Sequence, residues 1–149
     1  MAGAVTARGN TMRCTEFNIY ADPEAAHVVF EAWARTGCVI EVADWELTMR
    51  YGFTEAVRVE WEAANTAKSA FFATISAHSN EFIQAERRRT VQFFADPVAM
   101  AVALEPEIVT HSEQHHLAIE LTGQQTRGQT VVDWLDGDGM PKNAEIVMT

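Results

Sequence analysis

The amino-acid sequence predicts an α/β protein in which a strand–helix–strand start leads into a helical middle and a β-rich carboxy-terminal part. A strong helix-start signal lies between two strand-like segments near the beginning of the chain. A long segment poor in glycine and proline fills the middle, and four short strand-like segments fill the last third. The chain has 149 residues and no internal linker, so residues 1–149 are predicted to form one domain or one part of a domain.

The first elements follow from local signals. Residues 1–21 are predicted to be loop and strand, because they are rich in small residues and turn formers. A helix then begins, since Asp22 can cap it and Pro23 fits the first helical position. The helix should run to about Arg35 and end at Gly37. Residues spaced three and four apart predict its buried face: Ala26, Val29, Phe30 and Trp33.

The middle of the chain is predicted to be helical. Residues 38–43 are short and apolar enough for a strand, which completes the strand–helix–strand unit. Residues 55–89 are expected to be helical, and a break near Asn65 would make them two helices. The arginine run at 87–89 is expected to be a solvated helix end. A further helix is predicted over 96–105, which ends before a proline. One apolar stripe of the long segment contains Ala63, Ala67, Ala70, Phe71, Thr74, Ile75, His78 and Phe82.

The last third changes character, because short apolar segments alternate with polar turns. Residues 137–143 are rich in glycine and proline and predict a turn or loop. The predicted strands lie within residues 107–113, 115–122, 126–134 and 143–149.

Charge and cysteine content restrict the partners and the location. Eleven basic residues face 21 acidic ones, a formal charge of −10, which disfavours nucleic acids and anionic membrane surfaces and suits a neutral small molecule or a cation. Cys14 and Cys38 form no CxxC motif, so reduced intracellular thiols are expected. The first residues lack the apolar region of a signal peptide, and no apolar run is long enough to span a bilayer. A cytoplasmic protein is therefore predicted.

A polar cluster near the beginning of the chain is a candidate binding site. Glu16 and Asn18 are two residues apart, so on a strand they would point to the same side, and Asn10 lies in the preceding loop. A carboxylate beside an amide can clamp vicinal hydroxyl groups, because the carboxylate accepts hydrogen bonds while the amide donates and accepts. The alternative is a surface turn with a solvated strand end, which composition alone favours.

Two aspartates and three histidines are candidate metal ligands. Asp22 and Asp96 both stand in the sequence Ala-Asp-Pro, which is typical of a helix cap. The alternative for Asp96 is a calcium ligand, although one aspartate cannot hold such an ion alone. A zinc site at His111, His115 and His116 is disfavoured, because adjacent strand residues point to opposite faces.

The order of several motifs resembles that of the inosine–uridine-preferring nucleoside hydrolase family. These motifs are GN at 9–10, TEFN at 15–18, DPEAAHVVFEA at 22–32, ADPVAMAVALEPEIV at 95–109 and LTGQQTRGQTVVDW at 121–134. The resemblance covers nearly all of the chain and corresponds to the carboxy-terminal half of the family's domain. It implies part of a Rossmann-like α/β fold and an enzyme that cleaves the N-glycosidic bond of ribonucleosides with a calcium-bound water.

The resemblance also implies roles for individual residues. Glu16 and Asn18 match the family's ribose clamp, and Phe17 matches the aromatic residue between them. Asn10 lies six residues before Glu16, as the family's ribose-contacting asparagine does. Met1 would match the methionine of the family's MGG segment, with one residue more before the asparagine.

The metal site is where the sequence departs from the family. Asp96 matches a calcium-binding aspartate, but the family's DxDxxxDD cluster, which supplies most calcium ligands and the catalytic base, has no counterpart here. Many members also have histidine, a proposed proton donor to the leaving base, where this chain has Ala95. We therefore expect that roughly the first half of the family's domain is absent, and we assign no catalytic residue.

Two functional hypotheses follow. In the first, the chain is a nucleoside hydrolase that acts on a ribonucleoside and is inactive alone. In the second, it is a non-catalytic homologue that serves as a ribose-binding or subunit-interaction module. A sheet that lacks its first strands exposes edges and apolar faces, so we expect association with a second copy or with a full-length subunit.

Overall fold

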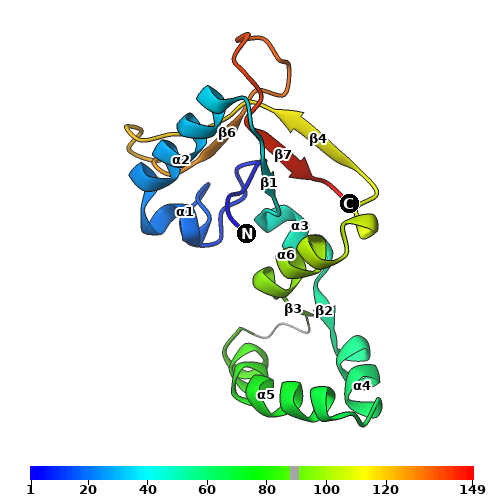
Figure 1. Cartoon of the computed structure of the whole chain (residues 1–149). Helices are drawn as coiled ribbons and strands as arrows, with labels where there is room; N and C mark the ends of the chain where they lie inside the picture. Colours follow the sequence, from blue (N-terminus) through cyan, green and yellow to red (C-terminus); the bar gives the residue numbers. More distant parts are fainter. Residues whose placement is uncertain (88–90) are drawn as a thin grey trace. The chain divides into compact units, whose positions relative to one another are not determined.

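Local signals place the helices, and long-range contacts divide the chain into two units (Figure 1). A computed structural model describes residues 1–87 and 91–149; the side chains of the predicted arginine run at 87–89 lie outside the described residues. The first unit contains Met1–Arg50 and Ala95–Thr149, and the second contains Tyr51–Phe94.

The predicted first strand is wrong. Residues 1–16 have no regular structure, and the short helix α1 (Phe17–Ala21) follows them. The reason is local, because the Glu16 side chain accepts a hydrogen bond from the backbone N–H of Asn18 and caps the helix. Glu16 and Asn18 are thus neighbours at a helix start and not on one side of a strand.

Helix α2 (Pro23–Thr36) confirms the start and end signals. The Asp22 carboxylate accepts a hydrogen bond of 2.9 Å from the Ala25 backbone N–H, and Pro23 occupies the first turn. Gly37 has a φ of 71°, the left-handed conformation that commonly ends a helix. The predicted face is buried at Phe30, but Val29 and Trp33 are exposed in this chain.

Removing the cap of α2 should have a small effect. In Asp22→Ala the Ala25 N–H loses its acceptor, so we expect the free energy of unfolding to fall by about 1 kcal/mol. Urea denaturation followed by circular dichroism measures the change. Asp138→Ala is the matched control, since this exposed carboxylate accepts no hydrogen bond within the described residues. Equal losses in both variants would contradict the assigned cap.

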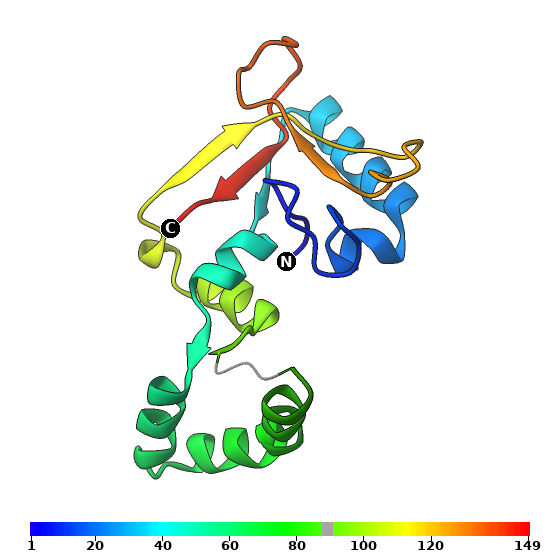
Figure 2. The same ribbon diagram turned by 180° about the vertical axis from the view of Figure 1, so that it is seen from behind.

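The sheet of the first unit has the strand order β1-β7-β4. Strand β1 (Ile40–Val42) runs parallel to β7 (Ala144–Val147), and β7 is antiparallel to β4 (Ser112–His115). Strands β5 (Leu117–Ile119) and β6 (Thr130–Val132) form a separate antiparallel pair. The loop that joins β6 to β7 extends away from the sheet, as Figure 2 shows. The last third is therefore β-rich, as predicted.

One predicted strand segment of this region begins later than expected. Residues 107–113 start within the 3-10 helix η1 (Pro106–Ile108), and only Ser112 onward joins β4. The proline at 106 fits the first turn of this helix, which directly follows α6 (Ala95–Leu104). The predicted start and end of α6 are confirmed to within a residue.

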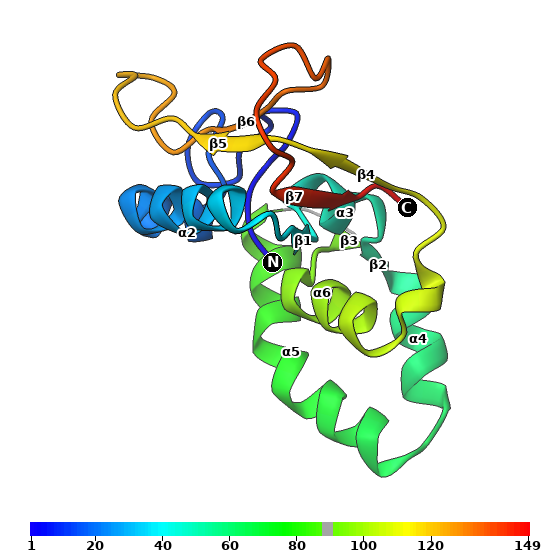
Figure 3. The ribbon, with the colours of Figure 1, turned by 45° about the horizontal axis from the view of Figure 1, so that its top comes forward.

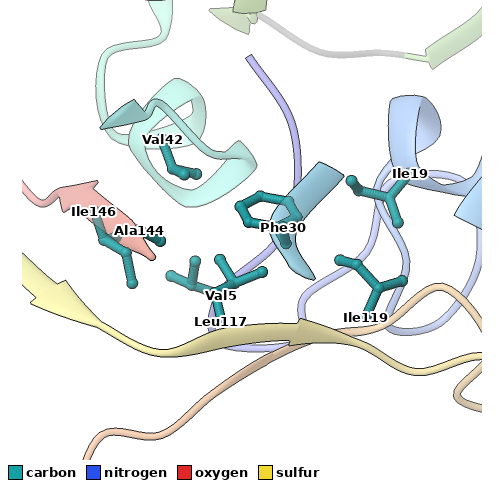
Figure 4. Close-up of a cluster of buried hydrophobic side chains, with 8 residues drawn as sticks. All are labelled: Val5, Ile19, Phe30, Val42, Leu117, Ile119, Ala144 and Ile146. Atoms are coloured by element: carbon teal, nitrogen blue, oxygen red, sulfur yellow. The ribbon is translucent and has the colours of Figure 1, made fainter. Parts of the chain in front are cut away.

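The core of the first unit lies where α2 packs against β5, which Figure 3 shows side by side. In Figure 4, Phe30 lies among apolar side chains from the first loop, α1 and the strands. The buried members of this core cluster are Val5, Ile19, Phe30, Val42, Leu117, Ile119, Ala144 and Ile146. A second cluster joins α3 (Trp45–Arg50) to α6 and contains Ala43, Leu47, Val102 and Val147.

The second unit is mainly helical. Strand β2 (Phe53–Thr54) pairs antiparallel with β3 (Val91–Gln92), and between them lie α4 (Glu55–Ala63) and α5 (Ala67–Arg87). The helical segment is therefore divided in two at the position that the sequence left open, and Asn65 adopts a positive φ of 48° between the two helices.

The aromatic side chains of the second unit correct the predicted stripe. Phe71, Ile75 and Phe82 of that stripe are exposed. The packed aromatic side chains are instead Phe53, Trp61, Phe72 and Phe94, whose ring centroids lie 5.2 to 5.9 Å apart. In neither unit is a described helix both long and apolar enough to cross a membrane.

Candidate functional site

The loop before α1 is held in a tight turn. The backbone N–H groups of Asn10, Thr11 and Met12 all donate to the Thr15 carbonyl at 3.3 Å. Glycine is required at position 9, since a Cβ there would lie 2.1 Å from the Met12 carbonyl oxygen. Thr15 itself is fully buried, and its hydroxyl donates to the Arg127 carbonyl at 2.9 Å. The turn is therefore fixed from both sides.

Glu16 connects this turn to the first residues of the chain. Only 2% of Glu16 is exposed, and its Oε2 accepts hydrogen bonds from the N–H groups of Asn18 at 2.9 Å and Gly3 at 3.2 Å. The other oxygen, Oε1, accepts no hydrogen bond from the part of the chain that the structure describes. A ligand hydroxyl could therefore donate to it.

Four other predicted residues surround Glu16. The Asn18 side-chain amide donates to the carbonyl oxygen of Met1 at 3.2 Å and to its Sδ at 3.4 Å. The Asn10 side-chain oxygen accepts from the Phe17 N–H at 2.8 Å. These contacts define a network of residues Met1, Asn10, Glu16, Phe17 and Asn18. Asn10, Phe17 and Asn18 are exposed, so the network presents two amides and an aromatic ring at the surface, above the buried Glu16 carboxylate.

Sequence reasoning missed the residues that support this network. Gly3 donates to Glu16 through its N–H and accepts a hydrogen bond of 2.9 Å from the Trp45 N–H at the start of α3. Arg127 pairs with Glu24 of α2 at 2.6 Å while its carbonyl holds Thr15, and the Arg127 guanidinium lowers the pKa of Glu24. The contacts of Gly3 with Trp45 and of Arg127 with Glu24 and Thr15 join residues more than 40 or 100 positions apart, which no local pattern reveals.

Asp96, the predicted metal ligand, is not joined to the network by any hydrogen bond of the described residues. It is exposed in the first turn of α6, which packs against α3, the helix that holds Gly3. In Figures 1, 2 and 3 the start of α6 lies near the N-terminus of the chain. The structure brings five of the six predicted residues together and leaves Asp96 on a neighbouring element.

The described residues do not fit a calcium site of their own. Calcium binds six to eight oxygen atoms. Within residues 1–87 and 91–149, no three acidic, histidine or cysteine side chains are grouped so that they could hold a metal ion. Asp96 alone therefore supports no metal-dependent step.

A pocket of about 410 Å³ lies beside the network. It is lined by Met12, Tyr20 and the start of α2, together with Gln124, Gln125 and Arg127. None of the six predicted site residues lines it, so the pocket was not anticipated from the sequence.

Comparison with known proteins decides the family. A sequence model described as "Inosine-uridine preferring nucleoside hydrolase" matches residues 1–149. The chain belongs to this family. The nucleoside hydrolase motifs found in the sequence are thus confirmed as marks of descent, and the α/β fold agrees with that of solved nucleoside hydrolases.

Three relatives show the extent of the similarity. The inosine-uridine preferring nucleoside hydrolase of Crithidia fasciculata is 33% identical over 127 residues, which are 85% of this chain and 38% of the relative. The pyrimidine-specific ribonucleoside hydrolase RihA of Salmonella typhimurium is 31% identical over 147 residues, 98% of this chain and 46% of the relative. A solved inosine-guanosine nucleoside hydrolase superimposes with a TM-score of 0.85 at 27% identity, covering 99% of this chain and 45% of that one. This nucleoside hydrolase chain spans less than half the length of these relatives.

Proposed function

We propose that this chain binds the ribose of a ribonucleoside, as one wall of a site in which the N-glycosidic bond is hydrolysed to ribose and base. The network around Glu16 carries the proposal. It places a buried carboxylate, two exposed amides and an aromatic ring on one short stretch of surface. The formal charge of −10 also suits a neutral nucleoside better than a phosphorylated one.

The roles follow from the hydrogen-bonding capacity of each group. Glu16 accepts from a ribose hydroxyl through Oε1, because Oε2 is already held by two backbone N–H groups. Asn18 and Asn10 can each donate to one sugar oxygen and accept from another hydroxyl. The exposed Phe17 offers an apolar face beside them.

The proposed hydrolysis also needs a calcium ion, and this chain supplies only part of the calcium site. Asp96 would contribute one oxygen ligand, and the remaining ligands and the group that activates water would come from outside the described residues. A ribose-binding or subunit-interaction module without turnover is the second candidate, favoured by the lack of a metal-holding group in the described residues. In either case, association with a second copy or a longer subunit is expected.

Glu16→Gln tests the proposed ribose contact. The glutamine keeps an oxygen that can accept from Gly3 and Asn18, so the fold should persist, but the charged acceptor for the sugar is lost. We expect the affinity for inosine or uridine, measured by NMR titration, to fall about tenfold.

The control is Glu107→Gln, which removes an exposed carboxylate in η1 and should leave the affinity unchanged. Unaltered binding in Glu16→Gln, or no saturable binding by the unmodified chain, would refute the proposal. Ribose release from inosine or uridine with added calcium then separates the two candidates. If the unmodified chain releases ribose and Asp96→Ala does not, the non-catalytic module is excluded. If the chain binds the nucleoside but releases no ribose, catalysis by this chain alone is excluded.

A further inference from the structure

The segment that carries Gly3 is attached to α3 by two acidic side chains. Asp44 directly precedes α3 and Glu46 lies in its first turn. Their carboxylates accept hydrogen bonds from the backbone of residues 5–8, immediately after the glycine that donates to Glu16. Two acidic side chains thus hold one loop, although neither was expected to have a role.

Asp44 is 2% exposed and both of its oxygens are occupied. Oδ1 accepts a hydrogen bond of 2.8 Å from the Leu47 N–H, and Oδ2 accepts one of 3.2 Å from the Val5 N–H. The first bond caps α3, and the second fixes the loop. Asp44 therefore joins the start of a helix to a segment 39 residues earlier in the chain.

Glu46 has one satisfied and one orphaned oxygen. Oε1 accepts from the Thr6 hydroxyl at 2.6 Å, from the Thr6 N–H at 3.1 Å and from the Arg8 N–H at 3.4 Å. Oε2 is buried and has no donor. A buried acceptor without a donor is costly, and the neighbouring Asp44 carboxyl, two residues earlier in the chain, interacts with the Glu46 side chain. A proton between the two carboxyl groups would supply the absent hydrogen bond.

We propose that Asp44 and Glu46 share one proton, that this pair positions the loop of residues 3–8 against α3, and that loss of the proton loosens the ribose-binding network. Two negative charges side by side in a buried place repel each other. The loop is the element that moves, because its N–H groups bind to both partners. Its displacement pulls Gly3 from Glu16 and Met1 from Asn18.

The electrostatics support this geometry. Burial, together with the neighbouring Glu46 carboxylate, raises the pKa of Asp44 from 3.8 to about 7. Burial also acts to raise the pKa of Glu46, but hydrogen bonds from Asp44 and Thr6 outweigh it and lower that pKa. The loop and the elements around α3 also carry Arg8, Glu41, Arg50 and Asp96, all exposed, together with the half-buried Glu145 on β7 and the buried Glu16 that binds Gly3.

The sign of the pH dependence follows from these shifts. The folded pKa of Asp44 lies above its ordinary value, so the stability that its proton contributes is present at low pH and declines as the pH rises toward about 7. The pKa of Glu46 is lowered, so the stability that its charged form contributes is present above its ordinary pKa and is lost as the pH falls into the acidic range. The loop should therefore be held in mildly acidic solution and loosen above neutrality.

Glu46→Gln is the decisive variant. Its side-chain oxygen can still accept from Thr6, and its amide can donate to Asp44 at every pH, so the pair stays closed without a shared proton. In the unmodified chain we expect the exchange protection of the Val5 and Thr6 amides to fall about tenfold relative to the Leu117 amide between about pH 5 and about pH 8. In Glu46→Gln this fall should disappear. Glu41→Gln, an exposed carboxylate on β1, should behave like the unmodified chain.

The effect on binding rests on the proposed function and has its own readout. The affinity for inosine should fall about tenfold over the same pH range in the unmodified chain, but stay constant in Glu46→Gln. An identical pH response of Val5 and Thr6 in both proteins overturns the proton-sharing pair. If the Val5 and Thr6 amides respond to pH but the affinity for inosine stays constant, the pair does not position the ribose-binding network. If inosine does not bind at all, the proposed function fails, and the amide measurements still decide the pair.

Discussion

Replacing Asn143 with alanine should lower the free energy of unfolding by about 3 kcal/mol, the largest loss of stability that we expect from a polar substitution in this chain. Asn143 is fully buried and its side chain is completely hydrogen-bonded. Its oxygen accepts from the Leu117 N–H at 2.7 Å, and its amide donates to the carbonyls of Leu117 at 2.9 Å and Phe30 at 3.1 Å. Alanine leaves the buried N–H and carbonyl of Leu117 without these partners and removes the side-chain donor to the Phe30 carbonyl of α2, and urea denaturation measures the cost.

Gln124→Ala is the matched control for this substitution. It removes a side-chain amide that is exposed and that makes no hydrogen bond within the described residues, so its effect should stay within about 0.5 kcal/mol. A similar urea midpoint for Asn143→Ala and the unmodified chain would show that water satisfies the three backbone groups, and that Asn143 does not join α2 to the strands.

The second large effect is expected at Gly9. In Gly9→Ala the added Cβ would lie 2.1 Å from the Met12 carbonyl oxygen and 2.5 Å from the Thr15 nitrogen, both of which are backbone atoms. The turn must rearrange, and with it the Asn10 side chain that accepts from the Phe17 N–H. Because Asn10 and Phe17 move together, we expect the affinity for inosine to fall about a hundredfold in an NMR titration.

Gly137→Ala serves as the control, since its Cβ would meet only the Asp133 Oδ1 at 4.0 Å, an ordinary contact. The Phe17 amide resonance reports on the turn even without ligand. An unchanged Phe17 resonance in Gly9→Ala would contradict the tight turn. A shifted resonance with full affinity would instead remove Asn10 and Phe17 from the binding site.

The helices show how far local sequence carries the prediction. The start of α2 at Asp22-Pro23 and its end at Gly37 were predicted and are observed, and the break near Asn65, which the sequence left open, is present. Each depends on hydrogen bonds or backbone angles within a few residues, which the local sequence contains. The same reasoning failed at Glu16, where a single side-chain bond to a neighbouring N–H makes a helix start from a segment that was predicted to be a strand.

Burial of the helix faces was harder to predict. Val29 and Trp33 have the spacing of a buried face, yet they are exposed in this chain, as are Phe71 and Ile75 of α5. Periodicity shows that a face is apolar, but it does not identify the element that covers it. In this chain the packed apolar side chains of α2 and α5 are therefore set by the neighbouring elements and not by the spacing alone.

By itself, the sequence determined the family, the boundaries of α2 and α6 and the identity of the candidate ribose-binding residues, because motifs and caps are local. Only the tertiary structure decided that Met1, Asn10, Glu16, Phe17 and Asn18 form one network and that Thr15 fixes its turn to the Arg127 carbonyl. It also decided that Asn143 joins α2 to β5 and that Asp44 and Glu46 form a buried pair. The physical reason is distance along the chain. Such contacts join residues up to 113 positions apart, and their partners are set by how the strands and helices pack.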